Sequence, residues 1–377
     1  MEELLKNQLV ASHAIAAAGS VGLATALTYP LDTVKVLVQV GSGASSKQLS
    51  SIQALSRVRN LSGSSGLYAG LGWLASGRIL GVGARFGVYE LLTAFYKDGR
   101  EYNRVYIAEA FMAGMAAGAT ESFIGSPFEL VKLRAQVASA SRIPSSTSVT
   151  ENKVGASVIA KLLRGFTPDK KALNQSVTLL STLTTKHPDF VGALQNYPWM
   201  MTGSGRPPSV CDVQRPSNVV SLEGVGALWR GVRSGVARDS IFGSIFFGCW
   251  QFLHEVMLVW KAVGMDPEPR NFDEIGPLSP MAVSLAAGFS GSLAAVASHV
   301  FDTAKSRSDC TVLPKYITME RRLLKWNRPG NIFQRIAGIH PTDKNILFRG
   351  IWLRVARSGF ASFAMVGSYY LAVNCLV

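Results

Sequence analysis

The chain has 377 residues, of which only 16% are charged, and its formal net charge is +14. Its mean hydropathy of +0.21 and its long charge-free runs argue against an ordinary soluble domain and favour a polytopic membrane protein with a polar interior. The four cysteines share no C-x-x-C spacing, so we expect neither a disulfide framework nor a metal site.

Six apolar segments follow one another along the chain. A bilayer core of about 30 Å needs roughly 20 apolar helical residues. Three runs without formal charge meet that length: Asn7–Leu31, Ile275–Phe301 and Ser358–Val377. Three further segments are apolar with isolated charges: 70–96, 106–136 and 229–260. We therefore expect six transmembrane helices.

The connecting loops differ in charge. Those after the first, third and fifth spans hold nineteen Lys or Arg, whereas the N-terminus and the other two loops hold six. The positive-inside rule then places the three basic loops on one face and both termini on the other. Residues 138–222, in the second basic loop, are rich in Ser, Thr and Pro and are expected to be an insertion.

A hexapeptide with an acid and a lysine three residues apart recurs near the end of each odd-numbered span. The copies read Pro30-Leu-Asp32-Thr-Val-Lys35, Pro127-Phe-Glu129-Leu-Val-Lys132 and Val300-Phe-Asp302-Thr-Ala-Lys305. The even-numbered spans begin with Tyr68-Ala-Gly70, Trp229-Arg-Gly231 and Phe348-Arg-Gly350. The repetition predicts three two-helix repeats, over 1–100, 101–260 and 261–377, around an axis along the membrane normal.

The repeated charges predict a gate. Pro30 and Pro127 should kink their helices, so that three helices converge at one end of a central cavity. Around the axis, the acid of one repeat should meet the lysine of another. The expected pairs are Asp32 with Lys132, Glu129 with Lys305, and Asp302 with Lys35. Such partly buried pairs are poor stabilisers but good switches, because desolvation nearly cancels their attraction.

These hexapeptides, together with Glu223-Gly224 leading to Trp229-Arg230-Gly231, resemble the mitochondrial carrier family. The resemblance implies an all-α membrane protein of six transmembrane helices in three pseudo-threefold two-helix repeats, with short matrix-side helices. It also implies a monomer of the mitochondrial inner membrane, alternating access, and cardiolipin as a bound structural lipid without any other cofactor. A plastid or peroxisomal membrane is less favoured.

The resemblance extends to the residues around the gate. Gln39 and Gln136, four residues after the first two lysines, match the glutamine braces of the family, whereas the third copy has Asp309. Val300 replaces the third proline, which should weaken that kink. The second gate of the family, on the even-numbered spans, is poorly matched: Thr93 and His254 stand at its basic positions.

Charges at similar depth in the even-numbered spans predict a substrate site. Arg78 follows Gly70 by eight residues, and Arg238 and Arg357 follow their glycines by seven. Intramembrane charges mark function by default. These positions resemble the substrate contact points of the family, and the candidate substrate-binding residues are Arg78, Glu121, Arg238, Asp239, Arg354 and Arg357. Alternatively, Arg238 and Asp239 pair with each other, and Glu121 is a structural partner of an arginine.

The leading hypothesis is transport of a small carboxylate, with an amino acid or related compound preferred because Arg238 and Asp239 together suit a carboxylate and an amino group. The alternative is a carrier-fold membrane adaptor without transport activity. The sequence contains no catalytic dyad or phosphate loop that would indicate an enzyme. Its basic residues lie in loops and not on one helical face, which argues against nucleic-acid binding.

Overall fold

A computed structural model describes residues 2–40, 50–98, 100, 105–140, 214–263, 265, 275–310 and 347–376. Its described elements are all helical. In chain order they are α1 (Glu2–Val40), α2 (Ser51–Ser62), η1 (Ser64–Tyr68), α3 (Leu71–Lys97), α4 (Ile107–Ser139), α9 (Pro216–Glu223), η2 (Val225–Trp229), α10 (Val232–Ala262), α11 (Pro280–Ala297), α12 (His299–Asp309) and α15 (Ile351–Leu376).

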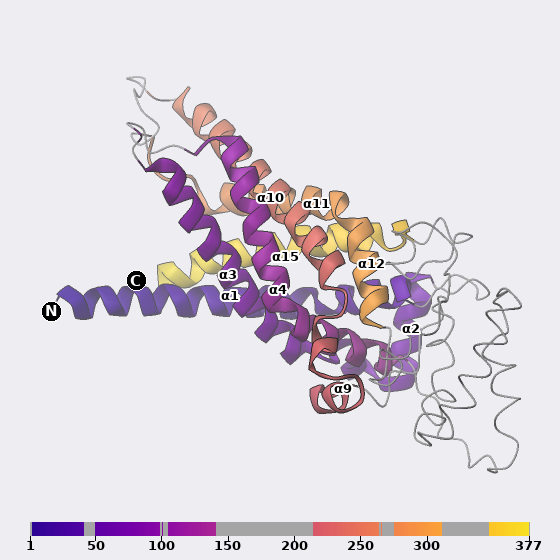
Figure 1. The fold of residues 1–377 in the computed structure, drawn as a ribbon. Helices are drawn as coiled ribbons and strands as arrows, with labels where there is room; N and C mark the ends of the chain where they lie inside the picture. The colour runs from indigo at the N-terminus through magenta and orange to yellow at the C-terminus, as the bar shows by residue number, and fades with distance from the viewer. Residues whose placement is uncertain are drawn as a thin grey trace, which may run out of the picture.

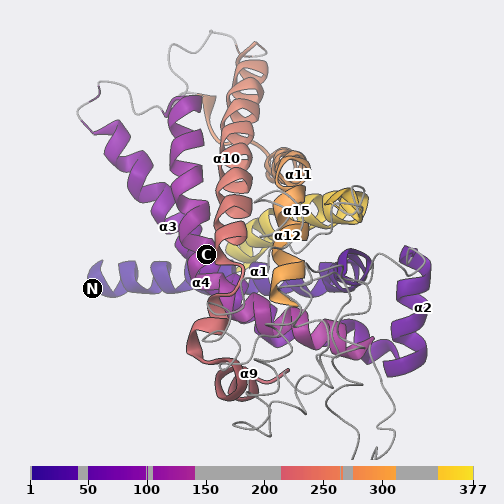
Figure 2. The same ribbon diagram turned by 45° about the vertical axis from the view of Figure 1, so that its right-hand side comes forward.

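The long helices form a closed ring in chain order. α1 packs on α3, α3 on α4, α4 on α10, α10 on α11, and α11 on α15, which returns to α1 (Figure 1). Each repeat contributes two neighbours, with α11 and α12 together forming the fifth long helix. Figure 2 shows the ends of α3 and α10 pointing away from the N-terminal end of α1, so the bundle is splayed on that side. The expected all-α fold of three two-helix repeats is therefore confirmed.

Three of these helices are both long and apolar enough to cross a membrane: Ala11–Val40, Val225–Ala262 (with η2) and Pro280–Ala297. The other three long helices have sufficient length, with 27 residues in α3, 33 in α4 and 26 in α15. They also carry charged side chains that line the cavity between the helices, arginines in α3 and α15 and Glu121, Glu129 and Lys132 in α4, which explains their lower hydropathy.

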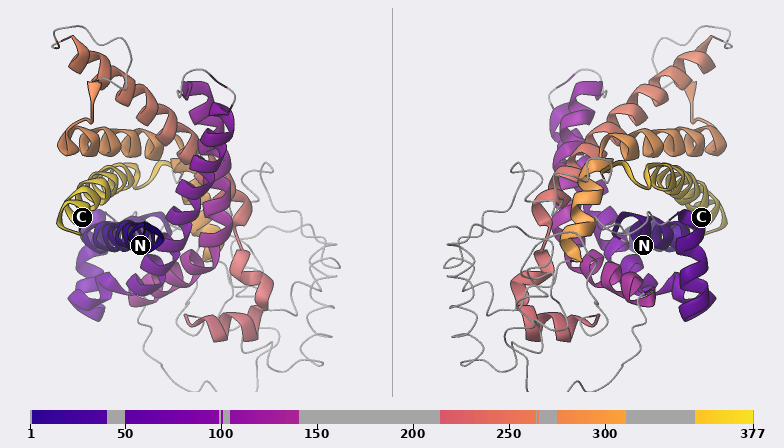
Figure 3. Two further views of the ribbon diagram at one scale, coloured as in Figure 1. Left: turned by 90° about the vertical axis from the view of Figure 1, so that its left-hand side faces the viewer. Right: turned by 90° about the vertical axis from the view of Figure 1, so that its right-hand side faces the viewer.

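In the first two repeats, short helices join the two long helices at the end opposite the termini, as Figure 1 shows from the side; the two panels of Figure 3 look at the termini and at the opposite end. In the first repeat α2 is followed by η1, and in the second α9 is followed by η2. Because α9 occupies residues 216–223, the expected insertion at 138–222 ends inside a regular element of the repeat. Most of that insertion, residues 141–213, lies outside the described residues.

Glycines allow the closest helix contacts. A Cβ atom on Gly118 would lie 1.9 Å from the backbone oxygen of Asp239, and one on Gly114 would lie 2.4 Å from that of Gly243. Small residues spaced by four positions bring helix backbones together in this way. The Gly114-x-x-x-Gly118 spacing thus lets α4 pack closely against α10.

The third odd-numbered helix is interrupted, although Val300 stands where the first two have Pro30 and Pro127. α1 and α4 continue as helices through Pro30 and Pro127, whereas α11 ends at Ala297 and α12 starts at His299. The expectation that Val300 weakens the third kink stays a prediction, because these helix bounds do not measure a bend angle. At the interruption, Arg354 donates hydrogen bonds to the backbone oxygen of Ser298 (2.9 Å) and to its Oγ (2.6 Å).

Candidate functional site

Three ion pairs between the repeats close one end of the bundle. Lys35 Nζ lies 2.9 Å from Asp302 Oδ2, Lys132 contacts Asp32, and Lys305 contacts Glu129. We call these six residues the acid–lysine ring. Each expected pair is present, and each joins α1, α4 or α12 to a different repeat. The ring therefore ties all three repeats together at the end where the short helices lie.

Two of the three pairs are braced by the predicted glutamines. Gln39 Nε2 donates to Asp302 Oδ2 (3.1 Å) and to Thr303 Oγ1 (3.2 Å). Gln136 Nε2 donates to Asp32 Oδ2 (3.2 Å) and to Thr33 Oγ1 (3.0 Å). Both glutamines are fully buried. Since hydrogen bonds to charged groups are stronger than neutral ones, these amides hold the acids in place while the lysines bind them.

Arg238 takes part in the third pair. Its Nη2 lies 3.0 and 2.9 Å from the two carboxylate oxygens of Glu129, and its Nε lies 2.7 Å from Asp239 Oδ1. Its Nη1 lies 3.5 Å from Oδ1 of Asp302, a second acid of the ring. In this conformation Arg238 and Asp239 do pair with each other, as the alternative interpretation expected, and Arg238 also reaches the ring.

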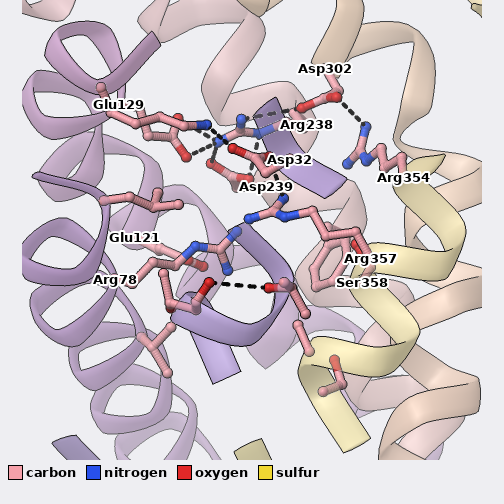
Figure 4. Close-up of a pocket in the computed structure, with 18 of the residues that line it drawn as sticks. Asp32, Arg78, Glu121, Glu129, Arg238, Asp239, Asp302, Arg354, Arg357 and Ser358 are labelled. Atoms are coloured by element: carbon pink, nitrogen blue, oxygen red, sulfur yellow. Dashed lines mark hydrogen bonds and ion pairs between the residues drawn. The ribbon is translucent and has the colours of Figure 1, made fainter. Parts of the chain in front are cut away.

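The arginines of α15 also contact acids of the ring. Arg357 Nη1 lies 3.2 Å from Asp32 Oδ1, and Arg354 Nη1 lies 3.6 Å from Asp302 Oδ2. Figure 4 shows these contacts together with that between Arg238 and Glu129. Each acid of the ring is thus shared between its lysine and an arginine of an even-numbered helix.

Arg78 differs from the other arginines of this region. The described part of the chain offers it no ion-pair partner, although it lines the same cavity. In Figure 4 the side chains of Arg78 and Arg357 point toward one another from α3 and α15. Nε of Arg357 is buried and has no hydrogen-bond partner among the described residues. These two arginines have the most capacity for an added anion.

The cavity above the ring is large and carries excess positive charge. It lies between all three repeats and is open to solvent, and the space within it together with that solvent amounts to about 1160 Å³. Eight Lys or Arg and six Asp or Glu side chains line it. An anion that enters would be attracted by this excess, because charges interact strongly where water is scarce.

Glu121 has a partner that we did not predict. It forms an ion pair with Arg85, whose guanidinium carbon lies 5.1 Å above the ring of Phe242. This contact fits the structural interpretation of Glu121 better than that of a free substrate contact. Arg85 follows Arg78 by seven residues, which is two helical turns, so the spacing along α3 was the signal that could have identified it.

A second charged cluster was also missed. Glu223 is fully buried between Arg134 and Arg230 and pairs with both. Arg134 stands two residues after Lys132, and the corresponding residue of the first repeat is Leu37. Leu37 packs in an apolar cluster with Ala54 and Val58 instead. The second repeat thus uses ionic contacts where the first uses apolar ones.

The opposite end of the even-numbered helices is closed less firmly. Tyr89 stacks on Phe247 with ring centroids 3.7 Å apart, and Thr93 Oγ1 donates to the backbone of Tyr89 (2.9 Å). Gln251 Nε2 donates to Val105 O (3.2 Å). Across the described residues, no ring of ion pairs links α3, α10 and α15 at this end, in line with the poorly matched second gate.

A ring of inter-repeat ion pairs below a charged cavity, within six helices in three repeats, defines a three-repeat carrier. The profile described as "Mitochondrial carrier protein" matches residues 6–100 and 103–169. The chain is therefore similar to the mitochondrial carrier family over these residues. The third repeat lies outside these matched ranges, and its assignment follows from the geometry of α11, α12 and α15.

Individual relatives agree with this similarity. The chain is 33% identical over 121 residues to mitochondrial brown fat uncoupling protein 1 of Rattus norvegicus, which covers 31% of this chain. It is 34% identical over 125 residues to mitochondrial citrate transporter C of Aspergillus niger, which covers 32% of this chain. The chain spans only 39% and 38% of the length of these two relatives, respectively.

Proposed function

We propose that the protein transports a small carboxylate across the mitochondrial inner membrane by alternating access. The observation that carries this proposal is the acid–lysine ring, which closes one end of a cavity lined by arginines. The ring lies on the side of the basic loops, so it would be the matrix-side gate. The cavity is formed by a single chain, which supports a monomer, with cardiolipin as a bound structural lipid.

The arginines couple substrate binding to this gate. Arg354 and Arg357 each contact one acid of the ring, and Arg238 contacts two, Glu129 and Asp302. A substrate carboxylate would compete with those acids for the same guanidinium groups. Because each acid would then lose at least one of its cations, binding would weaken all three ties between the repeats. Differential binding of a few kcal/mol is enough to shift such an equilibrium.

Within carboxylates, we favour an amino acid or a related compound that is exchanged for another solute. Arg238 and Asp239 lie side by side, so a carboxylate and an ammonium group could separate them and bind one each. The excess of positive charge in the cavity further favours a net anionic solute, such as an acidic amino acid. Arg78 and Arg357 would take the remaining carboxylate.

A carrier-fold adaptor without transport activity is the second candidate. The observation that favours it is the end opposite the ring, where the described parts of α3, α10 and α15 show aromatic stacking without a second set of ion pairs. An adaptor would keep the fold and the ring but would move no solute.

Proteoliposomes distinguish the two candidates. We expect purified protein to exchange labelled amino acids or dicarboxylates, and Arg78→Ala to reduce this exchange at least tenfold. Arg59→Ala is the matched control, because Arg59 is exposed on α2 far from the cavity. If well-folded protein exchanged no member of a panel of amino acids, keto acids and dicarboxylates, the transport proposal would be abandoned in favour of the adaptor.

A further inference from the structure

The third pair of the acid–lysine ring has an acid where the other two have a glutamine. Gln39, four residues after Lys35, donates to the pair that Lys35 forms, and Gln136 does the same for Lys132. Asp309 is four residues after Lys305. By the symmetry of the repeats it stands at the brace position of the pair between Lys305 and Glu129.

Asp309 is a buried acid without its own cation. It is 1% exposed, and it lines the cavity. Its Oδ1 has no hydrogen-bond partner among the described residues. That oxygen packs against Gly231, where an added Cβ would lie only 2.6 Å away. An ionised carboxylate is costly in such a place unless it is paired.

The charges around Asp309 are already engaged with other acids. Lys305 and Arg238 contact Glu129, while Arg134 and Arg230 contact Glu223. Asp309 lies beyond the apolar span Pro280–Ala297. Burial is the main reason that the pKa of its carboxyl group is raised to about 7, and the negative charge of Glu129 raises it further. A group with that pKa changes its charge within the physiological range.

We propose that Asp309 is a proton-binding site that sets the strength of the matrix-side gate. This inference rests on the proposed function only in calling the ring a gate. When Asp309 is protonated it is neutral, and Lys305 pairs with Glu129 of the neighbouring repeat alone. Ionised Asp309 competes for Lys305 from the same helix, since residues i and i+4 are neighbours. Raising the pH on this side therefore loosens the third tie between repeats.

The sign of the effect on stability follows from the raised pKa. Between the ordinary pKa of an aspartate, about 3.9, and about 7, the folded protein holds a proton that the unfolded chain has lost. Stability thus falls as the pH rises through this window and changes no further above it. Asparagine keeps the shape of protonated aspartate and cannot ionise, so Asp309→Asn should be stabilised most above pH 7.

The test compares the unfolding temperature and the exchange rate at several pH values for the wild type, Asp309→Asn and Asp309→Gln. Asp98→Asn is the matched control, because Asp98 is exposed at the end of α3. We expect the unfolding temperature of the wild type and of the control to fall between pH 5 and 8, and that of both Asp309 variants to fall less. We expect exchange by the wild type to rise several-fold between internal pH 6 and 8 and exchange by Asp309→Asn to stay flat.

The two readouts separate this inference from the proposed function. Unfolding profiles of Asp309→Asn and Asp309→Gln that match the wild type at every pH would overturn the proton site, even if exchange is robust. A normal rise of exchange with internal pH in Asp309→Asn would also overturn it. Absence of exchange in all proteins would instead count against transport, and the unfolding profiles would still decide whether Asp309 binds the proton.

Discussion

Removal of one glutamine brace should open the ring by a calculable amount. Gln39→Ala removes two hydrogen bonds donated by Nε2, one to Asp302 and one to Thr303, and the bond that Ser306 Oγ donates to its Oε1 (3.1 Å). A hydrogen bond to a charged group contributes about 1.5–3 kcal/mol, and a neutral one about 1 kcal/mol. Water would replace some of these hydrogen bonds. The closed state should still be destabilised relative to the open state by about 2 kcal/mol, which corresponds to a roughly 30-fold larger open population.

Cys310 provides a direct readout of that population. It is a buried free thiol at the end of α12, beside the ring. In a background where the other three cysteines are serine, its labelling rate by a water-soluble maleimide follows the open fraction when reclosing is fast. Gln251→Ala is the matched control, because Gln251 also donates two hydrogen bonds but lies at the opposite end. Equal labelling rates in Gln39→Ala and the control would refute the brace.

Three further predictions concern single contacts. Arg78→Gln should raise the KM for exchange tenfold or more and leave the unfolding temperature unchanged, because the described structure gives Arg78 no ion pair to lose; a marked loss of stability would show a structural role. Glu223→Gln leaves Arg134 and Arg230 without their shared carboxylate and should lower the free energy of unfolding by about 3 kcal/mol; an unaltered denaturation profile would contradict this. Gly118→Ala must push α4 away from α10 and should reduce the yield of folded protein by size-exclusion chromatography, whereas wild-type yield would show that the contact is loose.

The ring was predictable from the sequence because its geometry follows from repetition. Three equivalent acid–lysine spacings around one axis leave each lysine with an acid of another repeat, so the partners of Lys35, Lys132 and Lys305 could be named. The glutamine braces, one helical turn later, were expected from the resemblance to the mitochondrial carrier family. No tertiary detail beyond the rotational symmetry was needed.

The contacts that were missed break that symmetry. The helix interruption at Ser298 receives hydrogen bonds from an arginine of α15, and the pairing of Arg85 with Glu121 depends on how closely α3 approaches α4. Leu37 replaces an arginine in only one of three equivalent places. Such contacts depend on the packing of two helices and leave no regular spacing in the chain.

The positions of the candidate substrate-binding arginines were predictable, but their contacts were not. The sequence places Arg238 and Arg357 at matching depth, and both do line the cavity. Their contacts with Glu129 and Asp32 in the closed ring could not be read from spacing, because each acid already has a lysine partner. Only Arg78 stands in the structure as a cation of the cavity without an ion pair among the described residues.

The central claim is that the three acid–lysine pairs jointly hold one end of the cavity closed. A double-mutant cycle on Lys35→Ala and Asp302→Ala, read by the labelling rate of Cys310, tests it most directly. The two residues belong to the first and third repeats and lie 2.9 Å apart. If the pair holds the ring, the double variant should be labelled little faster than either single variant, with a coupling energy of about 1–3 kcal/mol. If the fold-increase of the double variant equals the product of the fold-increases of the two single variants, there is no coupling, and the pair does not hold the ring closed.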